Sequence, residues 1–203
     1  MGEIKTIWLW FDNKENHKIH PASVIALKIL LLTGVRSGSL RLAEWNEFDF
    51  DNNLWTIPVD HLKLRISQPR QPQKIHLTEL TKKLFFELKE LSGCKFALPG
   101  KDQSKPILKD SLARTAIRTQ GRIENIEPWT PHDLRRTFST QLNNLGVDTG
   151  IVEKCLGHKL PAIMATYNKS EHLPERAKAL ELWADKIGML VTNDNVIPFR
   201  KVG

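Results

Sequence analysis

Five side chains spread along the sequence are of the types that bind and transfer phosphate groups. Arg36 comes directly after a predicted helix end, so its side chain is free to reach a site. His132 and Arg135 are three residues apart, which places both on one face of a helix's first turns. His158 follows a glycine that stops a helix, and Tyr167, the only tyrosine in the chain, comes nine residues later. Each has an ordinary explanation by itself, but independent placements would rarely produce this set in this order.

These residue types match what the cleavage of a phosphodiester by a protein hydroxyl requires. Negative charge accumulates on the non-bridging oxygens in the transition state, and two guanidinium groups can hold those oxygens with paired, permanently charged donors. A histidine adds a further donor, while another histidine or a lysine can move protons to and from the bridging oxygens. Tyrosine suits the attack because its phenolate is a tolerable leaving group when the link is later reversed. The bond energy is conserved, so resealing needs no cofactor.

In this order the residues resemble those of the tyrosine recombinases, and the sequence segments around them are most similar to phage and genomic-island integrases. The resemblance runs from about Glu3 to Ile187 and is specific as an ordered set, whereas any single segment would be weak. It implies a site-specific DNA recombinase that cleaves and rejoins DNA strands through a 3′-phosphotyrosine intermediate, without a metal or another cofactor. The segments that carry it are Thr33–Arg36, Pro131–Thr137, Val152–His158, Tyr167-Asn168 and Leu182–Asp185.

Carried over position by position, the resemblance gives each of the five side chains a role. Arg36 and Arg135 would bind the scissile phosphate. His158 would donate a hydrogen bond to a non-bridging oxygen. His132 would act as general base or as a hydrogen-bonding support near the phosphate. Tyr167 would be the nucleophile that forms the 3′-phosphotyrosine link.

A lysine completes the set that the resemblance implies, and one acid of the family pattern is replaced. Lys63, after the second predicted strand, matches the family's lysine on a β-turn, which serves as general acid for the leaving 5′ hydroxyl. Lys74 competes for this role. The family usually carries an acid three residues after the first arginine, and Ser39 stands there in this chain. In the family that acid supports neighbouring active-site groups, so its replacement by Ser39 is expected to affect the level of activity.

Three other functions compete with a recombinase. A metal site made of His132, Asp133 and His158 is disfavoured, because the adjacent His132 and Asp133 do not share a helix face and no third histidine or cysteine has suitable spacing. A DNA-binding regulator could keep the scaffold and lack cleavage, and Ser39 is the feature that favours it. A type IB topoisomerase would use the same chemistry.

The composition favours a polyanionic partner. Lysine and arginine number 30 against 23 acids, which gives a formal charge of +7 and a pI near 9.5. Arg114, Arg118 and Arg122 recur every fourth residue and form either a solvated face or a phosphate-contacting stripe. Arg136, inside the second of the segments that carry the resemblance, is a further predicted DNA contact.

No membrane anchor or disulfide framework is expected. The longest apolar stretch, Val24 to Leu32, contains Lys28 and is too short to span a bilayer. The start of the chain has no signal peptide, and the two cysteines are predicted to be free thiols. A soluble, cytoplasmic protein follows as the expectation.

The elements that position these residues should be mostly helical. The expected fold class is mainly α, a helical tyrosine-recombinase catalytic domain with a small three-stranded antiparallel sheet. Capping residues, prolines at first turns and glycine stops mark the helix ends, such as Gly34 after the helix over 21–32 and the capping pair Thr130 and Asp133 before the helix over 131–145. The apolar face of the helix over 78–91 carries Leu80, Leu84, Leu88 and Leu91, and the inward face of the last helix carries Leu173, Ala177, Leu180, Ala184 and Ile187. Turn residues separate short β-rich runs. Helices are predicted over residues 2–11, 21–32, 37–44, 78–91, 111–120, 131–145, 148–157, 160–166 and 173–187, and strands over 48–50, 54–57 and 73–77.

One catalytic domain is expected over residues 1–191, followed by a C-terminal tail over 192–203. The tail carries the apolar Val196, Ile197 and Phe199 after a polar linker. It is therefore predicted to be flexible or exchanged between protomers. The resemblance also implies double-stranded DNA attachment sites as partners, a homotetramer assembled on DNA, and a preceding DNA-clamping domain in the full-length protein.

Overall fold

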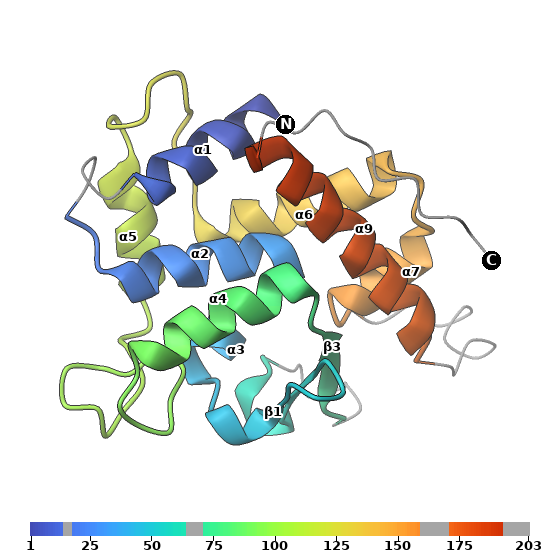
Figure 1. The fold of residues 1–203 in the computed structure, drawn as a ribbon, viewed down its shortest axis with the longest axis horizontal. Helices are drawn as coiled ribbons and strands as arrows, with labels where there is room; N and C mark the ends of the chain where they lie inside the picture. The colour runs from blue at the N-terminus through green and yellow to red at the C-terminus, as the bar shows by residue number, and fades with distance from the viewer. Residues whose placement is uncertain (14–17, 64–70, 159–170, 193–203) are drawn as a thin grey trace.

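The computed structural model describes residues 1–13, 18–63, 71–158 and 171–192. Within these ranges the chain forms eight α-helices and one antiparallel sheet that lies at an edge of the helical body (Figure 1). The fold class predicted from the sequence, mainly α with three antiparallel strands, is confirmed. The helices are α1 (Gly2–Asp12), α2 (Pro21–Thr33), α3 (Ser37–Leu42), α4 (Glu79–Glu90), α5 (Ser111–Thr119), α6 (Pro131–Asn144), α7 (Thr149–Cys155) and α9 (Leu173–Thr192).

Helix α2 lies at the centre of the molecule, among α4, α5, α6 and α9 (Figure 1). It is apolar on every side, and all of its residues from Val24 to Thr33 are buried, as packing among several helices requires. Its one charged residue, Lys28, pairs with Asp12 at the end of α1 and lies 4.7 Å from the centre of the Trp8 ring. Lys28, the charge inside the longest apolar stretch, therefore has an ionic partner and an aromatic partner within the fold.

Helix α2 ends at Thr33, and its C-cap Gly34 lies two residues before Arg36, the first predicted phosphate-binding arginine. Gly34 adopts a left-handed conformation with φ of +63°, and its N–H donates to the carbonyl of Leu30 at 2.9 Å. A Cβ at this position would clash with the ring of Phe138 on α6, which is fully buried. Backbone conformation and close approach both require glycine here.

We expect Gly34→Ala to lower the free energy of unfolding by about 2–5 kcal/mol, because a left-handed backbone costs about 1–2 kcal/mol for an L-residue and overpacking about 1–3 kcal/mol. Gly146→Ala is the matched control, since Gly146 has φ of +82° but a Cβ there would meet no described atom within 4 Å. The control should lose only the backbone part. Urea denaturation measures both variants, and equal losses would show that the Phe138 contact carries no cost.

The sheet has the strand order β1-β2-β3, with β1 (Phe48–Asp49), β2 (Leu54–Ile57) and β3 (Gln73–His76) all antiparallel. Trp55 pairs with Phe48 on one side and Ile75 on the other. Trp55 and Ile57 are fully buried, as strict alternation in a half-buried strand predicts. The Trp55 ring meets Phe85 of α4 at 5.6 Å between ring centres, so the sheet packs on α4.

Two short 3₁₀ turns flank the sheet strands. The turn η2 (Trp45–Glu47) leads into β1, and η3 (Val59–His61) follows β2. The predicted helix over 37–44 is shorter than expected, because α3 ends at Leu42 and the backbone then enters η2. These two turns lie beside the site described below.

Several predicted helix details were wrong. Leu91 was expected on the apolar face of the helix over 78–91, but α4 ends at Glu90 and Leu91 is 46% exposed, whereas Phe85, which was not predicted for that face, is fully buried. Gln120 is extended after α5, so Arg122 does not continue the helical stripe of Arg114 and Arg118.

The last helix is longer than predicted, since α9 continues to Thr192 rather than ending near Ile187. Its buried side is centred on Trp183, whose indole N–H donates to the carbonyl of Leu31 at 2.9 Å and ties α9 to α2. Of the residues predicted to face inward, Leu180, Ala184 and Ile187 are buried, whereas Leu173 and Ala177 are only partly so. The predicted helix over 160–166 and the tail over 193–203 lie outside the described residues.

Candidate functional site

A cleft of about 860 Å³ gathers five of the six predicted catalytic residues. It lies between α3, η3 and the first turns of α5 and α6, with the end of α7 at one side. The sixth residue, Tyr167, lies outside the described residues. The five that line the cleft come from four separate parts of the chain: Arg36, Lys63, His132, Arg135 and His158.

Arg36 reaches the cleft because α2 ends at Thr33, three residues before it. It occupies the N-cap position of α3 in an extended conformation and is half-buried. Burial lowers the pKa of Arg36 below its ordinary value. The guanidinium nevertheless stays charged near neutral pH, so it brings a permanent positive charge to the cleft.

Arg135 is the most deeply buried charge of the site, with 5% of its surface exposed. Its guanidinium donates to the carbonyls of Gly34 and, at 2.6 Å, Leu156, so it joins the ends of α2 and α7. Burial, reinforced by the nearby charge of Arg36, lowers the pKa of Arg135 to about 10, against an opposing effect of Glu153. Burial makes the charge costly, so an anion entering the cleft would stabilise it.

His158 is held between a cation and a carboxylate. Its Nε2 lies 2.9 Å from Nη2 of Arg135, and its Nδ1 lies 2.7 Å from Oε2 of Glu153. A guanidinium only donates, so this network assigns the acceptor role to Nε2 and the proton to Nδ1. Nε2 must itself carry a proton before it can donate to a phosphate, so it does not act as a donor in the network seen here.

Sequence reasoning missed Glu153. The available signal was its position on α7, five residues before His158 and close to the helix end. A carboxylate near a histidine in sequence is common, however, and only the turn at Gly157, with φ of +65°, brings the two side chains together.

His132 shares a side of α6 with Arg135, as its spacing predicted, and both line the cleft. The helix starts with the predicted capping box, in which Asp133 accepts hydrogen bonds from the backbone N–H of Thr130 at 3.0 Å and from its hydroxyl at 2.8 Å. The hydroxyl bond is the main cause of the lowered pKa of Asp133. Asp133 therefore serves the helix start, and His132 is left exposed at the rim of the cleft.

Lys63 and Lys74 differ in where they lie. Lys63 is exposed, follows η3 and lines the cleft. Lys74 lies on β3, its Nζ is 3.4 Å from Oε2 of Glu171, and it is not among the lining residues. The geometry therefore favours Lys63 for the general-acid role.

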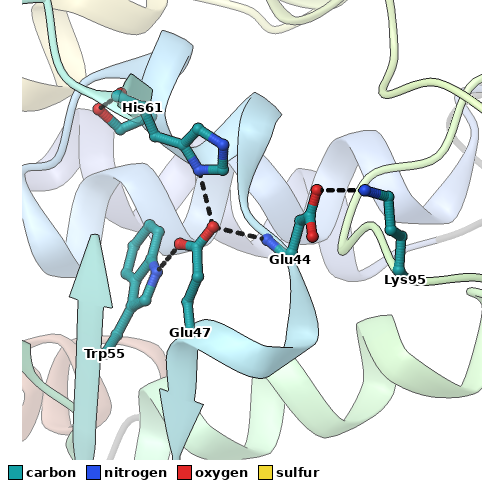
Figure 2. A network of polar contacts seen from close by, with 6 residues as sticks. Glu44, Glu47, Trp55, His61 and Lys95 are labelled. Atoms are coloured by element: carbon teal, nitrogen blue, oxygen red, sulfur yellow. Dashed lines mark hydrogen bonds and ion pairs between the residues drawn. The ribbon is translucent and has the colours of Figure 1, made fainter. Parts of the chain in front are cut away.

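Ser39 is buried in the wall of the cleft and bonds to the turn that precedes Lys63. It is 2% exposed, and its hydroxyl donates to the carbonyl of His61 at 2.9 Å. The His61 ring in turn has Nδ1 2.7 Å from Oε1 of Glu47, a carboxylate whose side chain is only 6% exposed (Figure 2). Neither Glu47 nor His61 was singled out from the sequence.

The predicted DNA-contacting arginines lie on the surface near the cleft. Arg114 and Arg118 are exposed on α5, whose first turn lines the cleft. Arg136 has 72% of its side chain exposed and lies 3.3 Å from Oδ1 of Asp133. All three are accessible to a large anion.

Two negative findings apply to the part of the chain that the structure describes. No three histidine, cysteine, aspartate or glutamate side chains in those ranges gather as metal ligands would. None of the described helices combines the length and apolar character needed to cross a bilayer.

Comparison with known proteins identifies a matching family and related integrases. Residues 3–173 match the model of the phage integrase family. The integrase of Enterobacteria phage P4 is 32% identical over 176 residues, which cover 81% of this chain and 40% of the relative. Prophage integrase IntZ of Escherichia coli strain K12 is 27% identical over 171 residues, covering 83% of this chain and 40% of the relative. The chain thus spans less than half the length of these curated relatives.

Solved structures share the fold. The integrase of the Tn1549 transposon, in complex with transposon right-end DNA, superposes with a TM-score of 0.66 at 18% identity, covering 88% of this chain and 62% of that one. XerA recombinase superposes with a TM-score of 0.61 at 19% identity, covering 91% and 63%.

Proposed function

Because the chain belongs to the phage integrase family, we propose that it is the catalytic domain of a site-specific recombinase that cuts and rejoins DNA through Tyr167. The observation that carries the proposal is the convergence of Arg36, Arg135 and His158 with Lys63 around one cleft. The two non-bridging oxygens of a scissile phosphate need hydrogen-bond donors in the transition state, and its leaving oxygen needs a proton. The cleft offers the guanidiniums of Arg36 and Arg135 and the imidazole of His158 for the non-bridging oxygens. It offers the ammonium of Lys63 for the leaving oxygen.

The reaction then follows from the groups present. The Tyr167 phenol attacks the phosphorus in line, with its proton passing to His132. Arg36 and Arg135 hold the non-bridging oxygens, where negative charge develops. The bond to O5′ breaks as Lys63 gives that oxygen a proton. A 3′-phosphotyrosine link remains, and a 5′ hydroxyl of another strand reverses the same steps to rejoin the DNA.

The experiment that tests this function is the trapping of the covalent intermediate. We expect a nicked suicide substrate carrying the element's attachment site to give a denaturant-resistant protein–DNA adduct in EDTA, because none of the proposed steps uses a metal. Peptide mapping should find the DNA on residue 167. A failure to form any adduct on the correct site, with DNA binding intact, would instead favour a DNA-binding regulator.

A topoisomerase is the remaining outcome of the same assay. Plasmid relaxation without strand exchange between two sites would identify it. Ser39, the feature that favoured a protein without cleavage, is compatible with a recombinase because it is buried in the cleft wall and hydrogen-bonded to the carbonyl of His61.

We also propose double-stranded DNA as the partner, with Arg114, Arg118 and Arg136 contacting phosphates beyond the scissile one. Residues 1–191 would act as the catalytic domain within a longer protein that carries a DNA-clamping domain, and tetramers would assemble on the attachment sites. Residues 192–203 would dock on a neighbouring protomer. Removing them should weaken tetramer formation on DNA in native gels while leaving single-site binding unchanged, and normal tetramers would contradict the docking.

A further inference from the structure

A buried polar network lies between the sheet and the turn that precedes Lys63 (Figure 2). At its centre is the carboxylate of Glu47. One oxygen, Oε2, accepts from the indole N–H of Trp55 at 2.8 Å, and the other accepts from the backbone N–H of Glu44 at 3.0 Å. The same second oxygen lies 2.7 Å from Nδ1 of His61. A buried carboxylate requires such partners, so its position is fixed.

Two independent contacts converge on His61. The Glu47 carboxylate lies at ion-pair distance from its ring, on the side of the sheet, while the Ser39 hydroxyl on α3 donates to its backbone carbonyl at 2.9 Å. Ser39 and Glu47 come from different elements and approach different atoms of the same residue. His61 is thus contacted at both its side chain and its main chain.

His61 is two residues before Lys63, and both residues line the cleft. Two residues span at most about 7 Å of chain, so fixing His61 restricts where the Lys63 backbone can lie. The lysine side chain has four rotatable bonds and is exposed, so its own contacts restrict it little. The turn below it must supply the positional accuracy that proton transfer needs.

We infer that Glu47 and Ser39 act together as a clamp on His61 that positions Lys63 for protonating the leaving 5′ oxygen. The inference rests on the proposed function. Glu47, Ser39 and His61 are positioning residues, and Lys63 alone transfers the proton. Ser39 fills the place where the family pattern has an acid, and the buried carboxylate beside this turn comes from Glu47, eight residues further along the chain.

The chemistry of the leaving group provides a selective test. In the ordinary substrate, Tyr167 forms the O–P bond, the P–O5′ bond breaks, and Lys63 gives its proton to O5′. A 5′-bridging phosphorothiolate replaces that oxygen with sulfur, which leaves as a thiolate and needs no proton, because thiols ionise near pH 8–9, at a pKa of about 8.5. A defect in proton donation should therefore disappear with the sulfur substrate.

We expect His61→Ala to slow cleavage of the oxygen substrate by about 10–100-fold and to cleave the sulfur substrate at close to the wild-type rate. Lys63→Ala should show the same pattern with a larger loss, about 10²–10⁴-fold. His61→Asn should recover most of the oxygen-substrate rate, because the asparagine amide can donate to Glu47 from the position of Nδ1. Ser39→Ala, which removes a single hydroxyl, should show a weaker form of the same selective defect.

His76→Ala is the matched control. His76 lies on β3, in the sheet next to η3, with Nε2 2.7 Å from Oε1 of Glu181, so it forms a histidine–glutamate contact of the same length as that of His61. It does not line the cleft, and its removal should slow the two substrates equally or not at all. A selective defect in this control would overturn the clamp, since general loosening of the sheet would then account for the effect.

Other outcomes separate this inference from the function on which it rests. If the wild-type protein forms no adduct with either substrate, the proposed function fails. If the wild type cleaves but His61→Ala is impaired equally on both substrates, His61 acts on phosphate binding or folding and the clamp alone is overturned. Rescue of Lys74→Ala rather than Lys63→Ala by sulfur would overturn it as well.

Discussion

Tyr167→Phe is expected to abolish the covalent protein–DNA adduct while leaving DNA affinity within about twofold of wild type. The substitution removes one hydroxyl and keeps the ring, and phosphate contacts to lysine and arginine supply most of the affinity. Tyr167 is the only tyrosine in the chain, so no second phenol can take its place. Denaturing gels with the suicide substrate measure the adduct, and binding titrations at two salt concentrations measure the affinity.

The position of Tyr167 in the chain is compatible with attack at the cleft. Nine residues separate it from His158, and that length of chain spans at most about 30 Å when extended. Tyr167 can therefore reach a phosphate held by Arg36 and Arg135. An adduct of unchanged yield in Tyr167→Phe would assign the nucleophile to another side chain and would contradict the proposed chemistry.

Local sequence signals predicted the elements that hold the site. The apolar stretch of α2, its stop at Gly34 and the capping box of Thr130 and Asp133 all appear where expected. These features depend on residues close together in sequence, whose backbone preferences act locally. They also place Arg36 and the pair His132 and Arg135 at chain positions from which a common cleft can form.

Contacts between residues far apart in the sequence could not be predicted from such local signals. Glu47 and His61 are fourteen residues apart, and Ser39 and His61 twenty-two, on elements joined only by the tertiary fold. Glutamate is mostly exposed in proteins and histidine is intermediate, so their residue types alone did not indicate a buried contact. The error at Leu91 has the same origin, because helical spacing assigned it to the core while the actual end of α4 left it exposed.

Arg135→Ala is expected to reduce the cleavage rate by about 10³-fold or more, as loss of a transition-state arginine does in other phosphoryl transfers. It should also lower the free energy of unfolding by about 1–3 kcal/mol, because the buried carbonyls of Gly34 and Leu156 lose their donor. His158 loses its Nε2 partner at the same time. Single-turnover cleavage and urea denaturation measure the two effects separately.

The adjacent Arg136 provides the control on the same helix. Its side chain is 72% exposed and contacts only Asp133 at 3.3 Å among the partners described. Arg136→Ala should therefore change stability by less than about 0.5 kcal/mol, weaken DNA binding uniformly and reduce its salt dependence. Cleavage at saturating DNA should remain near wild type. Equal loss of cleavage in both variants would contradict the assignment of Arg135, because that assignment depends on a difference between a buried phosphate ligand and a surface contact.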